Sequence, residues 1–240
     1  MTGRVAGIRA RIAAACERAG RDPSEVALLP VSKTFGEASI REAMALGLRR
    51  FGENKVQELR QKAESPELAG SGIDWVLIGH LQTNKARDVA RLAAEVQSVD
   101  RLELARALER RLQQEGRAID VLVQVKTSDE PSKYGLPPEQ LPGLLRELAG
   151  METLRVRGLM TLAIHSQDAA RVRACFRMLR ELRDRARDEP GGSGLERLSM
   201  GMSGDFEIAV EEGSTEVRIG TAIFGTRVYG DSHYWPESPQ

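Results

Sequence analysis

The sequence has little of what marks secreted, membrane-spanning or redox-active proteins. Two cysteines occur among its 240 residues, and the spacing of Cys16 and Cys175 fits neither a metal site nor a redox motif. Both lie in segments with helical periodicity, so we expect both to be reduced thiols that serve in packing. The longest apolar runs, such as residues 76–78, are far shorter than the roughly 20 residues that a membrane-spanning helix needs. We therefore expect neither a disulfide framework nor a membrane span.

The chain also lacks an excess of charge of either sign. Its 35 basic and 35 acidic residues cancel, which argues against nucleic acid or an anionic membrane as a partner. No secretory signal is visible. The first 21 residues are rich in arginine and poor in acidic residues, as in a transit peptide, but Val5, Ile8, Ile12 and Ala15 repeat at helical spacing. We predict a packed leading helix over residues 2–20, and the cytoplasm as the compartment.

Short apolar segments alternate with amphipathic segments along the chain. The apolar segments predict eight strands, at residues 27–33, 49–52, 73–79, 95–99, 119–125, 155–162, 198–202 and 216–219. The amphipathic segments predict helices at residues 38–48, 55–64, 85–94, 101–115, 138–149, 168–187 and 205–212. Asp100 is expected to cap the helix over residues 101–115.

This strict alternation predicts a parallel sheet, because each helix forms the crossover between two strands. Eight units in 240 residues fit a closed (β/α)8 barrel, the TIM barrel, whose typical length is about 250 residues. No Gly-x-Gly-x-x-Gly sequence follows the first strand, which disfavours an open dinucleotide-binding sheet. We predict one α/β domain over residues 1–230 and a loosely ordered polar tail over residues 231–240.

Lysine is scarce, with six among the 35 basic residues, and Lys33 stands in an unusual place. In a strand over residues 27–33, Leu29, Val31 and Lys33 share one face, so an ammonium ends an apolar row. An amine held against apolar walls can attack an aldehyde and form a Schiff base. The alternative is an ordinary lysine whose side chain extends to water.

The loops after the seventh and eighth predicted strands are rich in small residues. They expose backbone N–H groups, and a helix that starts near Ser203 directs its positive end toward a bound anion. Barrel enzymes often bind a phosphate in these two loops. Ser203 and Thr221 can add hydroxyl donors. The alternative is that Ser203 caps the helix and that Gly220 belongs to an ordinary turn.

Arg218 lies inside the apolar eighth strand, where a guanidinium requires a partner. One interpretation is a salt bridge to Glu207, Glu211 or Glu216. Another is a hydrogen bond to a heteroaromatic ring nitrogen, which stays unprotonated because arginine does not readily give up its proton. An aldehyde-capturing lysine, a phosphate-binding loop and a ring-nitrogen donor, at separate strand ends of one barrel, together indicate pyridoxal 5'-phosphate (PLP).

The chain contains seven notable motifs: Val-Ser-Lys-Thr at 31–34, Phe-Gly-Glu-Asn at 51–54, Ile-Gly-His-Leu-Gln at 78–82, Asn-Lys at 84–85, Gly-Leu-Met at 158–160, Leu-Ser-Met-Gly-Met-Ser at 198–203 and Val-Arg-Ile-Gly-Thr-Ala-Ile-Phe-Gly at 217–225. Together these motifs resemble the pyridoxal phosphate homeostasis protein family, which is similar to the alanine racemase barrel domain of fold-type III. The resemblance implies that Lys33 is the Schiff-base lysine and that Arg218 lies near the pyridine nitrogen. It implies that the other cofactor-binding residues are Asn54, Met160, Ser203, Gly220 and Thr221.

The resemblance leaves several positions open. His80 matches a family position, without a clear role, and is as consistent with a structural hydrogen bond. Lys133 matches a family lysine and is either a secondary aldehyde site or a solvated loop residue. Lys126 and residues 163–165 depart from the family pattern, so the loops after the fifth and sixth strands are less well predicted.

We predict a non-catalytic PLP-binding protein of vitamin B6 homeostasis, monomeric, with PLP and PLP-dependent apo-enzymes as partners. Alanine racemase needs a second base from an added β-domain, and little sequence follows the eighth predicted strand. An arginine-paired pyridine also makes PLP a poorer electron sink. The alternatives are a PLP-dependent amino-acid racemase, with Tyr134 or His165 as its base, and a Schiff-base aldolase without cofactor.

Overall fold

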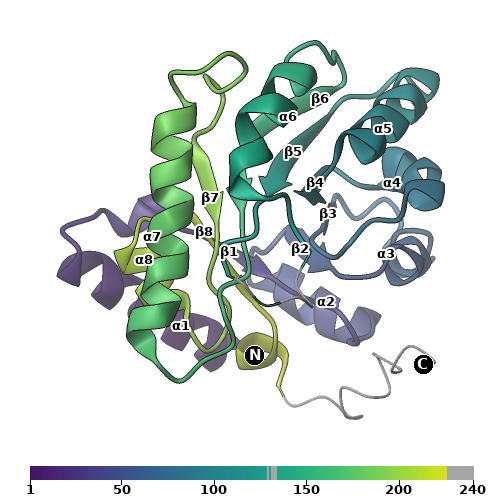
Figure 1. Ribbon diagram of the computed structural model, residues 1–240. Helices are drawn as coiled ribbons and strands as arrows, with labels where there is room; N and C mark the ends of the chain where they lie inside the picture. The colour runs from purple at the N-terminus through teal and green to yellow at the C-terminus, as the bar shows by residue number, and fades with distance from the viewer. Residues whose placement is uncertain (129, 131–133, 226–240) are drawn as a thin grey trace, which may run out of the picture.

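Eight parallel strands form a single sheet in the computed structural model, which describes residues 1–128, 130 and 134–225 (Figure 1). The strands are β1 (Ala27–Pro30), β2 (Arg50–Glu53), β3 (Asp74–Leu77), β4 (Glu95–Val99), β5 (Ile119–Gln124), β6 (Leu154–Met160), β7 (Arg197–Ser199) and β8 (Glu216–Ile219). Their spatial order is β1-β8-β7-β6-β5-β4-β3-β2, and a parallel bridge between Val31 and Gly52 joins the first strand to the second. The predicted TIM barrel is therefore confirmed.

Helices surround the strands on the outside of the barrel (Figure 1). They are α1 (Thr2–Arg18), α2 (Glu37–Ala45), α3 (Val56–Ala63), α4 (Ala86–Leu92), α5 (Leu102–Glu115), α6 (Leu141–Leu148), α7 (Ala169–Ala186), α8 (Phe206–Glu211) and α9 (Thr221–Phe224), with short 3-10 turns η1 (Pro23–Glu25), η2 (Thr83–Lys85) and η3 (Pro138–Gln140). Their apolar faces and the outer face of the sheet form the main core. None of the helices in the described part of the chain combines the length and apolar character that crossing a membrane requires.

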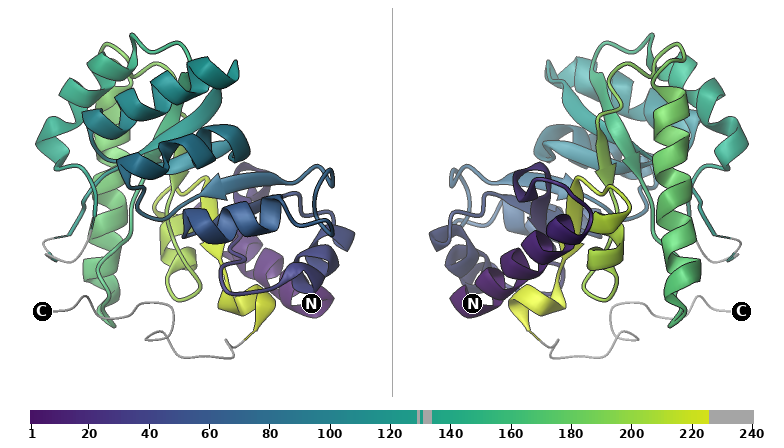
Figure 2. Two further views of the ribbon diagram at one scale, coloured as in Figure 1. Left: turned by 90° about the vertical axis from the view of Figure 1, so that its right-hand side faces the viewer. Right: turned by 90° about the vertical axis from the view of Figure 1, so that its left-hand side faces the viewer.

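The predicted leading helix is confirmed as α1. Its buried face contains the four residues that the periodicity selected, Val5, Ile8, Ile12 and Ala15, together with Cys16. This helix packs against α8 and beside α9 (Figure 2). Cys175 is buried in α7, and both cysteines are free thiols, as expected.

Five buried apolar side chains stand apart from the main core. They come from four strands or their ends, and they are Leu29, Val31, Val76, Leu122 and Met160. Since successive side chains of a strand point to opposite faces, we assign these residues to the inside of the barrel. Gly52 supports this, because a Cβ atom there would contact the side chains of Leu29 and Val31.

Two local predictions are wrong. Asp100 does not cap α5, whose first turn has Arg101 at the N-cap position without a side-chain hydrogen bond. The Asp100 carboxylate instead accepts a hydrogen bond from the Arg101 guanidinium. The first strand is also shorter than residues 27–33, since β1 ends at Pro30 and only a single bridge at Val31 follows. Lys33 therefore lies in a turn just beyond the strand. The predicted tail, residues 231–240, lies outside the described residues.

Candidate functional site

Most of the predicted site residues lie at one end of the barrel. Because all eight strands are parallel, the segments that follow them meet at the carboxyl end, where barrel enzymes build their sites. Lys33 follows β1, Asn54 follows β2 and Ser203 follows β7. Gly220 and Thr221 follow β8. Met160 is the last residue of β6, and Arg218 lies within β8.

Gly220 lies against the segment that leads to Lys33. A Cβ atom at position 220 would lie 3.3 Å from the Val31 carbonyl oxygen, which is closer than an ordinary contact. The Val31 N–H also donates to the Ile219 carbonyl at 2.8 Å. The β8 loop and the Lys33 turn are thus neighbours, as two parts of one binding site must be.

Asn54 is placed by a close backbone approach to the loop after β3. A Cβ atom at Gly79 would lie 2.0 Å from the Asn54 carbonyl oxygen, so only glycine fits there. Asn54 is half-buried, as is Lys33, whereas Met160 is fully buried.

Arg218 is fully buried, with 3% of its surface exposed, and its partners are neutral. Its Nη1 donates to the Ser199 hydroxyl at 2.8 Å, and its Nη2 donates to the Thr161 carbonyl at 2.7 Å. Burial lowers the pKa of the guanidinium to about 10, against the attraction of Glu216 and Asp205. Within the described residues Arg218 forms no ion pair, so the salt-bridge interpretation from the sequence is wrong.

A row of hydrogen bonds connects Arg218 to the other end of the barrel. The Ser199 hydroxyl that accepts from Arg218 donates to the Gln97 side-chain oxygen at 2.7 Å. The Gln97 amide nitrogen in turn donates to the carboxylates of Glu95 and Glu216. Each group donates in the same direction, so the row is continuous from cation to carboxylates.

Two arginines and two glutamates close the amino-terminal end of the barrel. Arg197 donates to Glu95 at 2.7 Å and to Glu216 at 2.9 Å, and Arg50 reaches the same two carboxylates at 2.8 and 2.6 Å. The two arginines lower the pKa of the Glu216 carboxyl although burial opposes them. Sequence analysis missed this quartet. Its one signal is that each member is the first residue of a strand.

The loop after β7 is fixed mainly by its backbone. Gly201 has a φ of 95°, and a side chain there would collide with Phe206 and Ala209. Its carbonyl accepts from the Arg218 N–H at 3.0 Å. Ser203 does not cap the helix, because the N-cap residue of α8 is Asp205, which accepts from the Met202 N–H at 2.6 Å. Ser203 is half-buried and Thr221 is exposed.

A second feature that sequence analysis missed lies behind the Lys33 turn. Lys62, on α3, is buried, and its ammonium donates to the carboxylates of Glu53 and Glu58 and to the Ser32 carbonyl. Burial raises the pKa of the Glu53 carboxyl to about 7, although Lys62 favours ionisation. One oxygen of this carboxyl has no hydrogen-bond partner among the described residues.

His80 and Tyr134 stack on each other at the same end of the barrel, with ring centroids 4.0 Å apart. Burial lowers the pKa of the His80 imidazole, while Asp100, at 3.6 Å, favours its protonation. Tyr134 is 58% exposed, and His165 is exposed on the loop after β6. Lys126 is half-buried, and Lys133 lies outside the described residues. No metal-binding group of histidines, cysteines and acids occurs in the described ranges.

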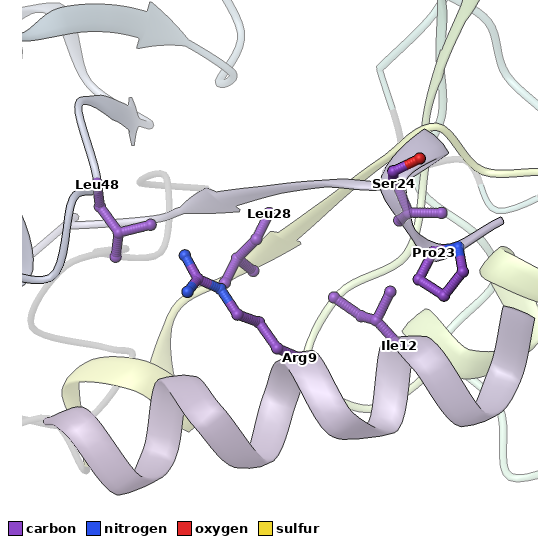
Figure 3. Close-up of a pocket in the computed structure, with 7 residues that line it drawn as sticks. Arg9, Ile12, Pro23, Ser24, Leu28 and Leu48 are labelled. Carbon is purple, nitrogen blue, oxygen red and sulfur yellow. The ribbon is translucent and has the colours of Figure 1, made fainter.

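A pocket of about 390 Å³ lies near the other end of β1, away from these residues (Figure 3). It lies between α1 and the start of β1, where Leu28 points toward the helix and the Arg9 side chain extends from the helix toward the strand. None of the predicted site residues lines this pocket. The residues that line it are Arg9, Ile12, Pro23, Ser24, Val26, Leu28 and Leu48.

Comparison with known proteins points to one family. Residues 4–228 match the family model described as alanine racemase, N-terminal domain. The chain is 45% identical to a pyridoxal phosphate homeostasis protein of Pseudomonas aeruginosa, over 94% of this chain and 95% of that protein. It is 42% identical to the Aquifex aeolicus protein of the same name, over 94% and 98% of the two chains.

A solved structure supports the same relationship. The structure of PipY from Synechococcus elongatus with PLP bound is 38% identical, with a TM-score of 0.78, and the match covers 91% of this chain and all of that one. The resemblance inferred from the motifs is therefore confirmed over nearly the whole length of the relatives. The chain belongs to the pyridoxal phosphate homeostasis protein family, within the alanine racemase N-terminal domain fold.

Proposed function

We propose that this protein binds PLP at the carboxyl end of its barrel, through a Schiff base with Lys33, and that it takes part in PLP homeostasis without substantial turnover. The observation that carries the proposal is the environment of Arg218. A buried guanidinium normally pairs with a carboxylate, yet the bonds of Arg218 go to a hydroxyl and a carbonyl. Neutral acceptors therefore already surround this cation, and a further neutral acceptor can bond to its remaining N–H groups.

The residues present fit this cofactor. The pyridine nitrogen of PLP is a neutral acceptor as long as it is unprotonated, and Arg218 has further N–H groups besides the two that bond to Ser199 and Thr161. PLP supplies an electron sink when bound, and an unprotonated pyridine weakens it. The donor set therefore favours holding PLP over catalysis on an amino acid.

The remaining assignments follow from position. Gly220 and Thr221 begin α9, and Ser203 lies in the glycine-containing loop before α8, so we assign the phosphate to these two loops. Asn54 and Met160 would line the cofactor from β2 and β6. The relatives' name and the PLP bound to PipY support the cofactor assignment.

The physiological role that we propose is a reservoir. The protein would take up PLP reversibly and release it to PLP-dependent apo-enzymes, acting as a monomer in the cytoplasm. A racemase would need a second base near the substrate. Tyr134 and His165 are the sequence-based candidates, but the Tyr134 ring stacks on His80 and the His165 side chain is exposed, and neither observation favours that role.

The test is PLP uptake followed by borohydride reduction and peptide mass mapping. The wild-type protein should become yellow, with the reduced adduct on Lys33, and Lys33→Ala should lose the visible band. Lys55→Ala, which removes an exposed lysine, is the control and should retain the band. Absence of uptake, or an adduct only on other lysines, would refute the proposal, and racemisation of alanine at enzyme-like rates would refute the non-catalytic role.

A further inference from the structure

The cluster behind the Lys33 turn has a specific arrangement. The Lys62 ammonium donates to the Ser32 carbonyl at 2.7 Å, to Glu53 Oε1 at 2.7 Å and to Glu58 Oε1 at 2.8 Å. Glu53 also accepts from the Ser32 hydroxyl at 2.5 Å. Helix α3 therefore contributes a buried cation that contacts the backbone of the residue before Lys33.

The residue after Lys33 is held by the same helix. The Thr34 N–H donates to Glu58 Oε1 at 2.5 Å, so one carboxylate oxygen binds both Thr34 and Lys62. Thr34 has a φ of 71°, the left-handed conformation that β-branched residues rarely adopt. Such backbone strain persists only where surrounding contacts enforce it. The Glu58 contact is on the strained residue itself.

We propose that Lys62 and Glu58 are positioning residues for Lys33. Together they hold the peptide groups on both sides of it, Ser32 and Thr34, so that its amine meets the aldehyde of PLP in one orientation. This inference rests on the proposed function and deepens it. In the reaction, the Lys33 nitrogen bonds to the aldehyde carbon, and the aldehyde oxygen leaves as water with the two protons of the neutral amine.

Stability alone does not explain the cluster. It has one ammonium for two carboxylates, and an oxygen of Glu53 is buried without a partner among the described residues. Well-packed apolar residues of similar size often stabilise a protein as well as a buried ion pair does, or better. Orientation of a reacting group, in contrast, requires directional contacts, and misplacement by about 1 Å can cost on the order of a hundredfold in rate.

The experiment compares Lys62→Met with Val89→Ala, which truncates a buried residue of α4 that takes no part in the cluster. Hydrogen exchange of the Thr34 amide is measured in the PLP-free proteins, and the rate of PLP uptake is followed by visible absorbance. We expect Lys62→Met to speed Thr34 exchange and slow PLP uptake, each by about tenfold or more. Val89→Ala should change both by less than about threefold, even where it lowers the melting temperature equally.

A second substitution tests whether strain at Thr34 causes the slower PLP uptake. Thr34→Gly removes the penalty of the left-handed conformation, so in the Lys62→Met background it should recover at least several-fold in uptake rate. If Lys62→Met does not fold, Glu58→Ala replaces it, because the Glu58 side chain is partly exposed.

Uptake by Lys62→Met at the rate of Val89→Ala would overturn the proposal, and so would unchanged Thr34 exchange or failure of Thr34→Gly to rescue. If the wild-type protein takes up no PLP, the proposed function fails instead. The exchange measurement still decides whether the two residues hold the turn.

Discussion

The two ends of the barrel treat buried charge differently. At the amino-terminal end, Arg50 and Arg197 each bind both Glu95 and Glu216, so two cations face two anions. At the carboxyl end, Arg218 has a hydroxyl and a carbonyl as partners within the described residues. Only the first arrangement pairs each cation with carboxylates and is neutral overall.

The same contrast holds for two buried carboxyls. Burial opposes ionisation of both, but two arginines and Gln97 lower the pKa of Glu216, whereas Glu53 shares one ammonium with Glu58 and its pKa rises to about 7. A balanced cluster stabilises a fold and has no capacity left for a ligand. A cluster with unequal numbers of cations and anions can still bind a ligand, or can hold a turn that carries a reactive amine. The carboxyl end therefore has the electrostatics of a site.

The largest expected effect on stability comes from disrupting the quartet at the amino-terminal end of the barrel. Arg197→Met leaves Glu95 and Glu216 buried with Arg50 as their remaining cation, and removal of one partner from a buried ion pair costs about 3 to 5 kcal/mol. We expect a loss of this size in the free energy of unfolding, measured by urea denaturation of the PLP-free protein. Arg106→Met, which breaks an exposed pair with Glu147, is the control and should cost less than about 1 kcal/mol. Equal losses in the two variants would contradict the stabilising role of the quartet.

The second prediction concerns how stability depends on pH through Glu53, at the carboxyl end of the barrel. The Glu53 carboxyl has its pKa raised from 4.5 to about 7 by burial, so the native protein holds this proton below about pH 7. Because the native state then binds more protons than the unfolded state, stability decreases as pH rises between these two values. Glu53→Gln removes the titration. Relative to this variant, wild type should lose on the order of 3 kcal/mol between pH 5 and pH 8.

Urea denaturation of both proteins at pH 5 and pH 8 gives this difference directly. A difference that is independent of pH would mean that Glu53 is ionised throughout and that Lys62 compensates its burial completely. The buried carboxyls of Glu53 and Glu216, at the two ends of the barrel, would then both be ionised.

Sequence reasoning predicted the parts of this molecule that depend on short-range pattern. Alternating segments indicated the barrel, and helical spacing selected the buried face of α1. Position at strand ends, together with the family motifs, brought Lys33 and Gly220 into one region. These predictions succeed because parallel strands place their carboxyl ends together whatever the details of packing.

Charge pairing was less predictable, because it depends on which elements pack together. One interpretation of Arg218 was a salt bridge to Glu207, Glu211 or Glu216. Arg11, Arg18 and the arginines of the quartet bind those carboxylates instead. Lys62 resembles a surface residue in a charged helix. Its burial follows only when α3 covers the turn after β1, so no local pattern reveals it.

The smallest expected effect on stability comes from replacing Arg218, the buried arginine whose hydrogen-bond partners are neutral. Arg218→Met removes two hydrogen bonds to neutral acceptors but also relieves the cost of burying a cation, so we expect a change of at most about 2 kcal/mol. If Arg218 bonds to the PLP ring as we propose, PLP affinity should fall by about tenfold or more, because one charge-assisted hydrogen bond is lost. Urea denaturation and a PLP titration measure the two quantities. A stability loss as large as that of Arg197→Met would show that Arg218 is as integral to the fold as the quartet, and the contrast between the two ends would not hold.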